Sequence, residues 1–265
     1  KELNEEQAKH ILGAQANMWT EYIKNTSKAE YMMFPRMAAL SEVLWTAKEK
    51  KNWNDFETRL MTQFKRYDLW KVNYSKAYFD LKATILPTED YNGILWRLET
   101  KMNNPTIKYR DANDTDSIGM SDFFDYQSPI KIQKSIRYEV INGDINKQTG
   151  NSLFQNFRFN KATGKKITLT TAPSPNYPGD GAFTLVNGVQ NEKGLARSKE
   201  FLGFSGTNCE ATIDLGIDSS INEIIIHTIE QAGSWIYFPS AFDISKSADG
   251  INFSPLNTAV SISKS

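Results

Sequence analysis

Trp19 and Glu21 are the residues of this chain best suited to chemistry, because they end an apolar stretch, residues 11–22, two positions apart. This stretch predicts a short buried strand, on which side chains two apart share a face. An indole stacks on the C–H face of a sugar ring, and a neighbouring carboxylate accepts hydrogen bonds from two hydroxyls. The alternative, favoured by the spacing alone, is a core tryptophan beside a surface glutamate, since W-x-E is a weak pattern.

A strand at residues 11–22 needs a sheet, because its backbone groups require ladder partners. No other strand precedes it in the sequence, so we expect its sheet to lie outside this chain and the chain to be a piece of a longer protein. Residues 259–260 resemble the start of a strand with nothing after it to complete the pairing, which predicts a cut at this end too.

The elements that follow Trp19 and Glu21 are predicted to be helical. A segment from about residue 28 to residue 50 carries apolar residues near helical spacing, with Pro35 near its start, where it would end or kink what precedes it. A second helix is expected to begin after Asn52 or Asn54, either of which could cap it. Its apolar stripe and its end are predicted at these positions: Phe56, Leu60, Phe64 and Tyr67, with the end near residues 71–74.

These stretches resemble glycoside hydrolase family 20, the β-N-acetylhexosaminidases, over about residues 8–75. The family pattern G-G-x-x-x-x-W-x-E stands here as Gly13-Ala14-Gln15-Ala16-Asn17-Met18-Trp19-Thr20-Glu21, with Ala14 in place of the second glycine. Residues 31–45 are similar to the final helix of that family. The resemblance implies the last strand and helices of a (β/α)₈ barrel at residues 1–80. It also implies that Trp19 walls the terminal-sugar pocket and that Glu21 binds the 4- and 6-hydroxyls.

The same resemblance implies that the catalytic residues are missing from this chain. In the family the substrate acetamido oxygen is the nucleophile, while an Asp-Glu pair on an earlier strand orients it and supplies the acid/base. The two other carboxylate pairs here, Glu5-Glu6 and Glu89-Asp90, lie in polar or loop sequence and are expected to be solvated. We therefore expect no catalytic residue and no enzymatic activity in the fragment itself.

The rest of the chain predicts two all-β regions. Short strands separated by turn signals favour a small β-sandwich linker at residues 84–160, in the ranges 93–99, 106–110, 130–132 and 135–141. Beyond about residue 160, strands expected at 166–171, 210–215, 221–229 and 241–246 suit a second sandwich or jelly roll at residues 161–265. The predicted fold class is thus mixed: an α/β barrel remnant followed by two β-sandwiches.

The last region resembles a discoidin-type (coagulation-factor C-type, galactose-binding-like) module in three stretches: residues 182–188, 210–216 and 242–253. Such modules often follow family-20 catalytic domains in bacteria and commonly bind carbohydrate. Many hold a structural calcium near the first loop, but the usual Asp is Asn187 here, and the lost charge weakens that prediction. Trp235 and Tyr237 are candidate sugar-stacking residues; the alternative is that they are simply core, the usual place of large aromatics.

Composition excludes several functions. Lys+Arg 31 balances Asp+Glu 31, which argues against a nucleic-acid partner. No apolar run is long enough for a membrane span. The single cysteine forms no internal disulfide, and the two histidines are too far apart in sequence to suggest a metal cluster or a triad. Apart from the calcium, we expect no cofactor and no metal.

These observations predict the C-terminal portion of an exo-acting β-N-acetylhexosaminidase that acts on glycans ending in N-acetylhexosamine. Its partner would be the remainder of the catalytic barrel. The parent protein is expected in the periplasm, on the outer membrane or outside the cell, although this sequence does not itself show its location. Two alternatives stay open: a carbohydrate-binding accessory module and a structural spacer.

Overall fold

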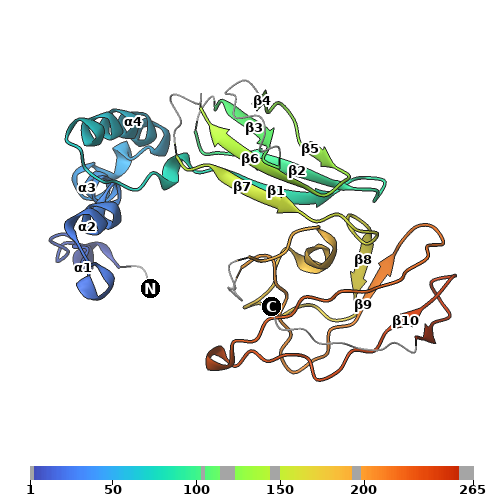
Figure 1. Cartoon of the computed structure of the whole chain (residues 1–265). Helices are drawn as coiled ribbons and strands as arrows, with labels where there is room; N and C mark the ends of the chain where they lie inside the picture. Colours follow the sequence, from blue (N-terminus) through green and yellow to red (C-terminus); the bar gives the residue numbers. More distant parts are fainter. Residues whose placement is uncertain (1–2, 103–104, 114–122, 144–149, 193–197, 257–265) are drawn as a thin grey trace. The chain divides into compact units, whose positions relative to one another are not determined.

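The structure is a computed structural model that describes residues 3–102, 105–113, 123–143, 150–192 and 198–256. The chain divides into two compact units, Lys1–Tyr78 and Phe79–Ser265. The first contains the helices and the second contains short antiparallel strands, both drawn in Figure 1. The predicted mixture of helices and small sheets is confirmed. No helix in the described ranges is long and apolar enough to cross a membrane.

The first unit contains four α-helices: α1 (Glu5–Ala8), α2 (Thr26–Met33), α3 (Arg36–Trp45) and α4 (Trp53–Leu69). The predicted helix over residues 28–50 is broken into α2 and α3 at the cis Phe34-Pro35 bond. A proline at this point cannot continue the backbone hydrogen bonding of the helix before it. Many apolar side chains of α2 and α3, among them Met37 and Leu44, remain exposed in this unit.

Helix α4 begins and buries its side chains as its sequence predicts. The Asn52 side chain accepts a hydrogen bond from the Asp55 N–H at 3.1 Å and caps the helix. All four residues of the apolar stripe are buried: Phe56, Leu60, Phe64 and Tyr67. Tyr67 packs against Phe34 with ring centroids 5.0 Å apart. The stripe therefore holds α4 against the junction of α2 and α3.

The strand predicted over residues 11–22 does not form within this chain. Residues 11–19 lie in no helix or strand and are exposed, and Thr20–Tyr22 form a short 3₁₀ helix, η1. Trp19 does have an extended backbone, with φ −83° and ψ 127°. An extended segment becomes a strand only when a neighbour supplies ladder partners, and no described segment pairs with this one.

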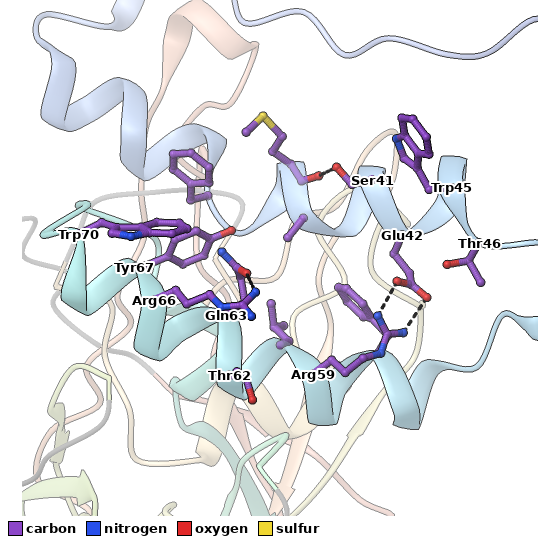
Figure 2. Close-up of a pocket in the computed structure, with 15 residues that line it drawn as sticks. Ser41, Glu42, Trp45, Thr46, Arg59, Thr62, Gln63, Arg66, Tyr67 and Trp70 are labelled. Carbon is purple, nitrogen blue, oxygen red and sulfur yellow. Dashed lines mark hydrogen bonds and ion pairs between the residues drawn. The ribbon is translucent and has the colours of Figure 1, made fainter.

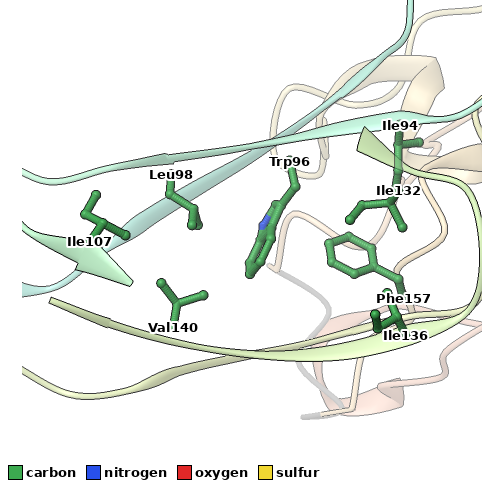
Figure 3. Close-up of a cluster of buried hydrophobic side chains, with 8 residues drawn as sticks. All are labelled: Ile94, Trp96, Leu98, Ile107, Ile132, Ile136, Val140 and Phe157. Carbon is green, nitrogen blue, oxygen red and sulfur yellow. The ribbon is translucent and has the colours of Figure 1, made fainter. Parts of the chain in front are cut away.

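The second unit begins with two sheets that share one core. The first sheet has the order β1-β2-β5 and the second the order β4-β3-β6-β7, all pairs antiparallel. Their bounds are β1 Lys82–Pro87, β2 Ile94–Glu99, β3 Ile107–Asp111, β4 Phe124–Asp125, β5 Ile130–Ile132, β6 Ile136–Asn142 and β7 Leu153–Phe157. Side chains from both sheets form the cluster in Figure 3: Ile94, Trp96, Leu98, Ile107, Ile132, Ile136, Val140 and Phe157.

Trp96 is the largest fully buried side chain of this core. Its ring stacks on Tyr138 at 5.5 Å and meets Phe157 edge-on at 5.3 Å. The indole N–H has no hydrogen-bond partner among the described residues. The core extends beyond the two sheets, because Phe183 and Val189 also pack against it.

Gly164 makes a close backbone contact between this later segment and the β1–β2 turn. Its φ is +77°, and a Cβ there would lie 2.3 Å from the Gly93 carbonyl oxygen. Lys165 Nζ donates a hydrogen bond to Asn92 Oδ1 at 2.8 Å beside it. Only glycine fits this position without displacing backbone.

The remaining strands are short: β8 (Lys166–Leu169) pairs with β9 (Ala211–Asp214), and β10 (Ser245–Lys246) pairs with β11 (Ser254–Pro255). The strand predicted at 221–229 is wrong, and the one at 241–246 is reduced to β10. β-branched side chains favour strands only where a neighbour and a buried face are supplied, and residues 221–228 are exposed. The predicted strand start at 259–260 lies outside the described residues.

Candidate functional site

Trp19 and Glu21 lie together on an exposed segment of the first unit. The Trp19 side chain is 77% exposed in this unit. Glu21 is exposed too and lies within η1. An exposed indole and an exposed carboxylate two positions apart are both accessible to a ligand.

The chain after Glu21 is fixed by two local hydrogen bonds. The Ile23 N–H donates to the Thr20 carbonyl at 3.0 Å and closes η1. Asn25 caps α2, its side-chain oxygen accepting from the Lys28 N–H at 2.9 Å. The position of Glu21 therefore depends on the position of the first turn of α2.

Helix α2 is in turn held by Asn73, which lies just after the turn that ends α4. The Asn73 side-chain amide donates to the Ser27 hydroxyl at 2.8 Å and to the Ser27 carbonyl at 3.0 Å. Its backbone N–H donates to the Glu30 carboxylate at 2.9 Å. Sequence reasoning missed this tie, because no local pattern indicates a contact between residues so far apart in the chain.

A groove of about 730 Å³ lies between α3 and α4. Figure 2 shows Trp45 on the α3 side and Tyr67 and Trp70 on the α4 side. Arg59 spans the groove and donates to both Glu42 carboxylate oxygens, at 2.9 and 2.8 Å. This hydrogen bonding to Arg59 lowers the pKa of Glu42 below its ordinary value.

The groove lacks the groups that glycosidic cleavage needs. Glycosidases of the usual kind use two carboxyl groups, one of them protonated as the acid. Glu42 is the sole carboxylate among the described residues that line the groove, and its lowered pKa keeps it ionised. Trp19 and Glu21 do not line it. The ion pair between Arg59 and Glu42 joins α3 to α4, which is a structural role.

Comparison with known proteins finds a family likeness in the first part of the chain. Residues 1–48 match the model of glycosyl hydrolase family 20, catalytic domain. The matched family-20 segment contains Trp19, Glu21, α2 and α3.

Two curated proteins extend this likeness. A beta-hexosaminidase of Porphyromonas gingivalis (strain ATCC BAA-308 / W83) is 39% identical over 74 residues, covering 28% of this chain and 10% of that protein. A beta-N-acetylhexosaminidase of Cellulomonas fimi is 38% identical over 50 residues, covering 19% of this chain and 10% of that protein. The chain thus spans about a tenth of the length of these relatives.

The carboxylate pairs outside the family-20 pattern are in surface settings. Glu6 forms an ion pair with Lys9 at 2.5 Å, with both side chains exposed. Asp90 lies in the β1–β2 turn, where hydrogen bonds from Thr88 and the Asn92 N–H lower the pKa of its carboxyl. A general acid requires a raised pKa instead. Neither setting suits acid catalysis.

The second unit holds the other predicted site residues, Trp235 and Tyr237. They are 84% and 59% exposed, and their role in sugar stacking stays a prediction. Trp235 has a left-handed backbone, φ 59° and ψ 32°. Hydrogen bonds between Gln231 and Ile236, in both directions, close the turn around it. The turn thus holds an indole in solvent in a backbone conformation that is costly for a bulky residue.

The predicted calcium site in this unit stays a prediction. The Asn187 side-chain oxygen accepts a hydrogen bond from the Val189 N–H at 2.9 Å, and the residue is buried. Among the described residues no three His, Cys, Asp or Glu side chains are grouped as metal ligands.

Proposed function

We propose that this chain is the C-terminal part of an exo-acting β-N-acetylhexosaminidase. The full-length protein would remove terminal N-acetylglucosamine or N-acetylgalactosamine from glycans. The match of residues 1–48 to the family-20 catalytic domain carries this proposal. The names of the two relatives, both hexosaminidases, support it.

In this proposal, Trp19 and Glu21 bind the terminal sugar without taking part in bond cleavage. The exposed Trp19 ring offers an apolar face to the C–H groups of the pyranose. The Glu21 carboxylate accepts hydrogen bonds from the 4- and 6-hydroxyls, and bonds to a charged acceptor are the stronger kind. These contacts would hold the sugar while its own acetamido oxygen attacks the anomeric carbon and displaces the protonated leaving group. Water would then attack the same carbon and reopen the acetamide ring, so that two inversions give net retention of configuration.

The acid/base and acetamide-orienting carboxylates would come from sequence outside this chain. The pairs that the chain does contain, Glu5-Glu6 and Glu89-Asp90, lie on the surface. The proposal therefore assigns to this chain one wall of the pocket, two helices that support that wall and a β-rich accessory region. In the accessory region, the discoidin-like assignment of residues 161–265 is part of the same proposal.

The 265-residue chain alone is expected to release no nitrophenol from nitrophenyl N-acetyl-β-glucosaminide, because it lacks the catalytic pair. The full-length protein, assayed in parallel at the same molar concentration, is expected to release it. Release by the purified chain itself would show that its own residues supply the chemistry. An inactive full-length protein would contradict the proposed function.

The exposed turn around Trp235 favours a second candidate function, carbohydrate binding by the second unit. Trp235 and Tyr237 lie two positions apart, and their side chains are 84% and 59% exposed. Both rings can stack on the faces of sugar rings. This function is compatible with the first, since an accessory module would keep the enzyme on a glycan surface. A structural spacer is the remaining alternative and requires no binding.

Replacing Trp235 with alanine in the 265-residue chain is expected to weaken binding to a glycan array by about tenfold or more, the usual effect of truncating an aromatic anchor. The melting temperature should stay within about 2 °C, because the side chain is exposed. Phe124→Ala, at another exposed aromatic of the same unit, is the matched control and should leave binding intact. A wild-type chain that binds no glycan would favour the spacer.

A further inference from the structure

We propose that Asn73 is a positioning residue for Glu21. The inference rests on the proposed function, because it assigns a role within the same sugar-binding segment. Asn73 lies beyond residues 1–48, the part that matches the family-20 model, yet it makes three hydrogen bonds to α2.

The three hydrogen bonds fix α2 at two points on one face. Ser27 and Glu30 are three residues apart on the helix and therefore point to the same side. Asn73 donates from its side chain to Ser27 and from its backbone to the Glu30 carboxylate. Contacts one turn apart resist both sliding and rotation of the helix.

Asn73 can act as an anchor because the chain on its N-terminal side is itself held. α4 ends in a Schellman turn, in which the Val72 N–H donates to the Tyr67 carbonyl and the Lys71 N–H to the Asp68 carbonyl. Lys71 adopts the left-handed backbone, φ 56°, that this turn requires. The direction in which the chain leaves α4 toward Asn73 is therefore fixed.

The C-terminal side is held as firmly. Tyr74 is buried, stacks on Phe64 at 5.1 Å and donates its hydroxyl hydrogen to Asp68 at 3.0 Å. The next residue, Ser75, donates its N–H to the Phe34 carbonyl at 2.9 Å. Asn73 thus projects from a stretch that is packed into the core of the first unit.

From Ser27 the coupling to Glu21 is short. Ser27 lies in the first turn of α2, which Asn25 caps through the Lys28 N–H. The chain before the cap is the 3₁₀ turn closed by Ile23 and Thr20, and that turn contains Glu21. Release of the first turn of α2 would therefore let the carboxylate move relative to the bound sugar.

Such movement should alter sugar binding and leave the reacting atoms largely unaffected. Glu21 is proposed to contact hydroxyls remote from the cleaved bond, and misplaced binding groups weaken substrate binding. The 4-hydroxyl is the one whose orientation distinguishes glucosamine from galactosamine. The ratio of kcat/KM for the two epimeric substrates therefore reports on Glu21 and does not depend on how much enzyme is folded.

The test uses Asn73→Ala in the full-length protein. We expect the KM for nitrophenyl N-acetyl-β-glucosaminide to rise about fivefold with kcat within about twofold, and the epimer ratio to shift about threefold. Hydrogen exchange of the Ile23 and Lys28 amides should become about tenfold faster, since their local bonds would open more often. Asn54→Ala, at an exposed asparagine in the first turn of α4, is the matched control.

Two substitutions at Glu30 distinguish loss of this contact from misfolding of the Asn73 variant. Glu30→Gln keeps an acceptor for the Asn73 N–H and should retain the wild-type KM, whereas Glu30→Ala should shift KM in the same direction as Asn73→Ala. A fall in kcat alone, with an unchanged epimer ratio and unchanged exchange at Ile23 and Lys28, would show a merely structural role and overturn the proposal. If the wild-type full-length protein is inactive but Asn73→Ala still exchanges faster than wild type at Ile23 and Lys28, the structural coupling stands and the proposed function is overturned instead.

Discussion

Replacing Glu21 with alanine is expected to lower kcat/KM of the full-length protein by about 10²–10³-fold. In the proposed function the carboxylate accepts hydrogen bonds from two sugar hydroxyls, and each bond to a charged acceptor contributes about 1.5–3 kcal/mol. Two bonds near the lower end of that range together contribute about 3–4 kcal/mol, so losing both would cost two to three powers of ten in rate constant. Steady-state hydrolysis of nitrophenyl N-acetyl-β-glucosaminide measures this fall in kcat/KM.

Two further variants isolate the contribution of the Glu21 charge. Glu21→Gln keeps one acceptor without the negative charge and should lose about tenfold, between wild type and alanine. Glu49→Ala removes an exposed glutamate from the same unit and should leave kcat/KM unchanged. An active wild-type enzyme that tolerates Glu21→Ala would show that this carboxylate does not touch the substrate.

Replacing Trp96 with alanine is expected to destabilise the second unit by about 3–5 kcal/mol, the usual cost of emptying a large aromatic site. Its side chain has no exposed surface and contacts rings from the facing sheet. A loss of this size is a large fraction of the stability of an ordinary domain. Urea denaturation of the 265-residue chain should show an earlier transition for this unit.

The control for Trp96 separates its volume from its polar group. Trp96→Phe fills most of the space and removes an indole N–H that has no hydrogen-bond partner in the described part of the chain. Since an unpaired buried donor costs about 1–3 kcal/mol, the lost contacts are offset and the net change should be within about 1.5 kcal/mol. A cooperative, wild-type transition in Trp96→Ala would mean that the cluster in Figure 3 is not the core of this unit.

The elements predicted well from sequence are those determined by local chemistry. The cap at Asn52, the apolar stripe of α4 and the break at Pro35 all follow from side-chain properties within a few residues. β5 occupies Ile130–Ile132 as predicted, because short β-branched runs bounded by turn residues leave few alternatives.

The elements predicted poorly depend on partners distant in sequence. The segment before Glu21 has the composition of a strand, but pairing depends on a second strand that sequence patterns do not specify. The same holds for residues 221–229. Asn73 also could not be identified, because its contacts with Ser27 and Glu30 arise only once α2 and α4 are packed. The family resemblance, and not periodicity, points to Trp19 and Glu21, whose role in sugar binding stays a prediction.

The extension of the sandwich core to Phe183 and Val189 limits how the protein can be dissected. A piece starting at residue 161 would carry both side chains away from the core that they cover and would leave Ile94 and its neighbours open on the other piece. Both pieces would then expose apolar surface and tend to associate. Binding assays on the accessory region are best made on a piece that begins at Phe79, the boundary of the compact unit.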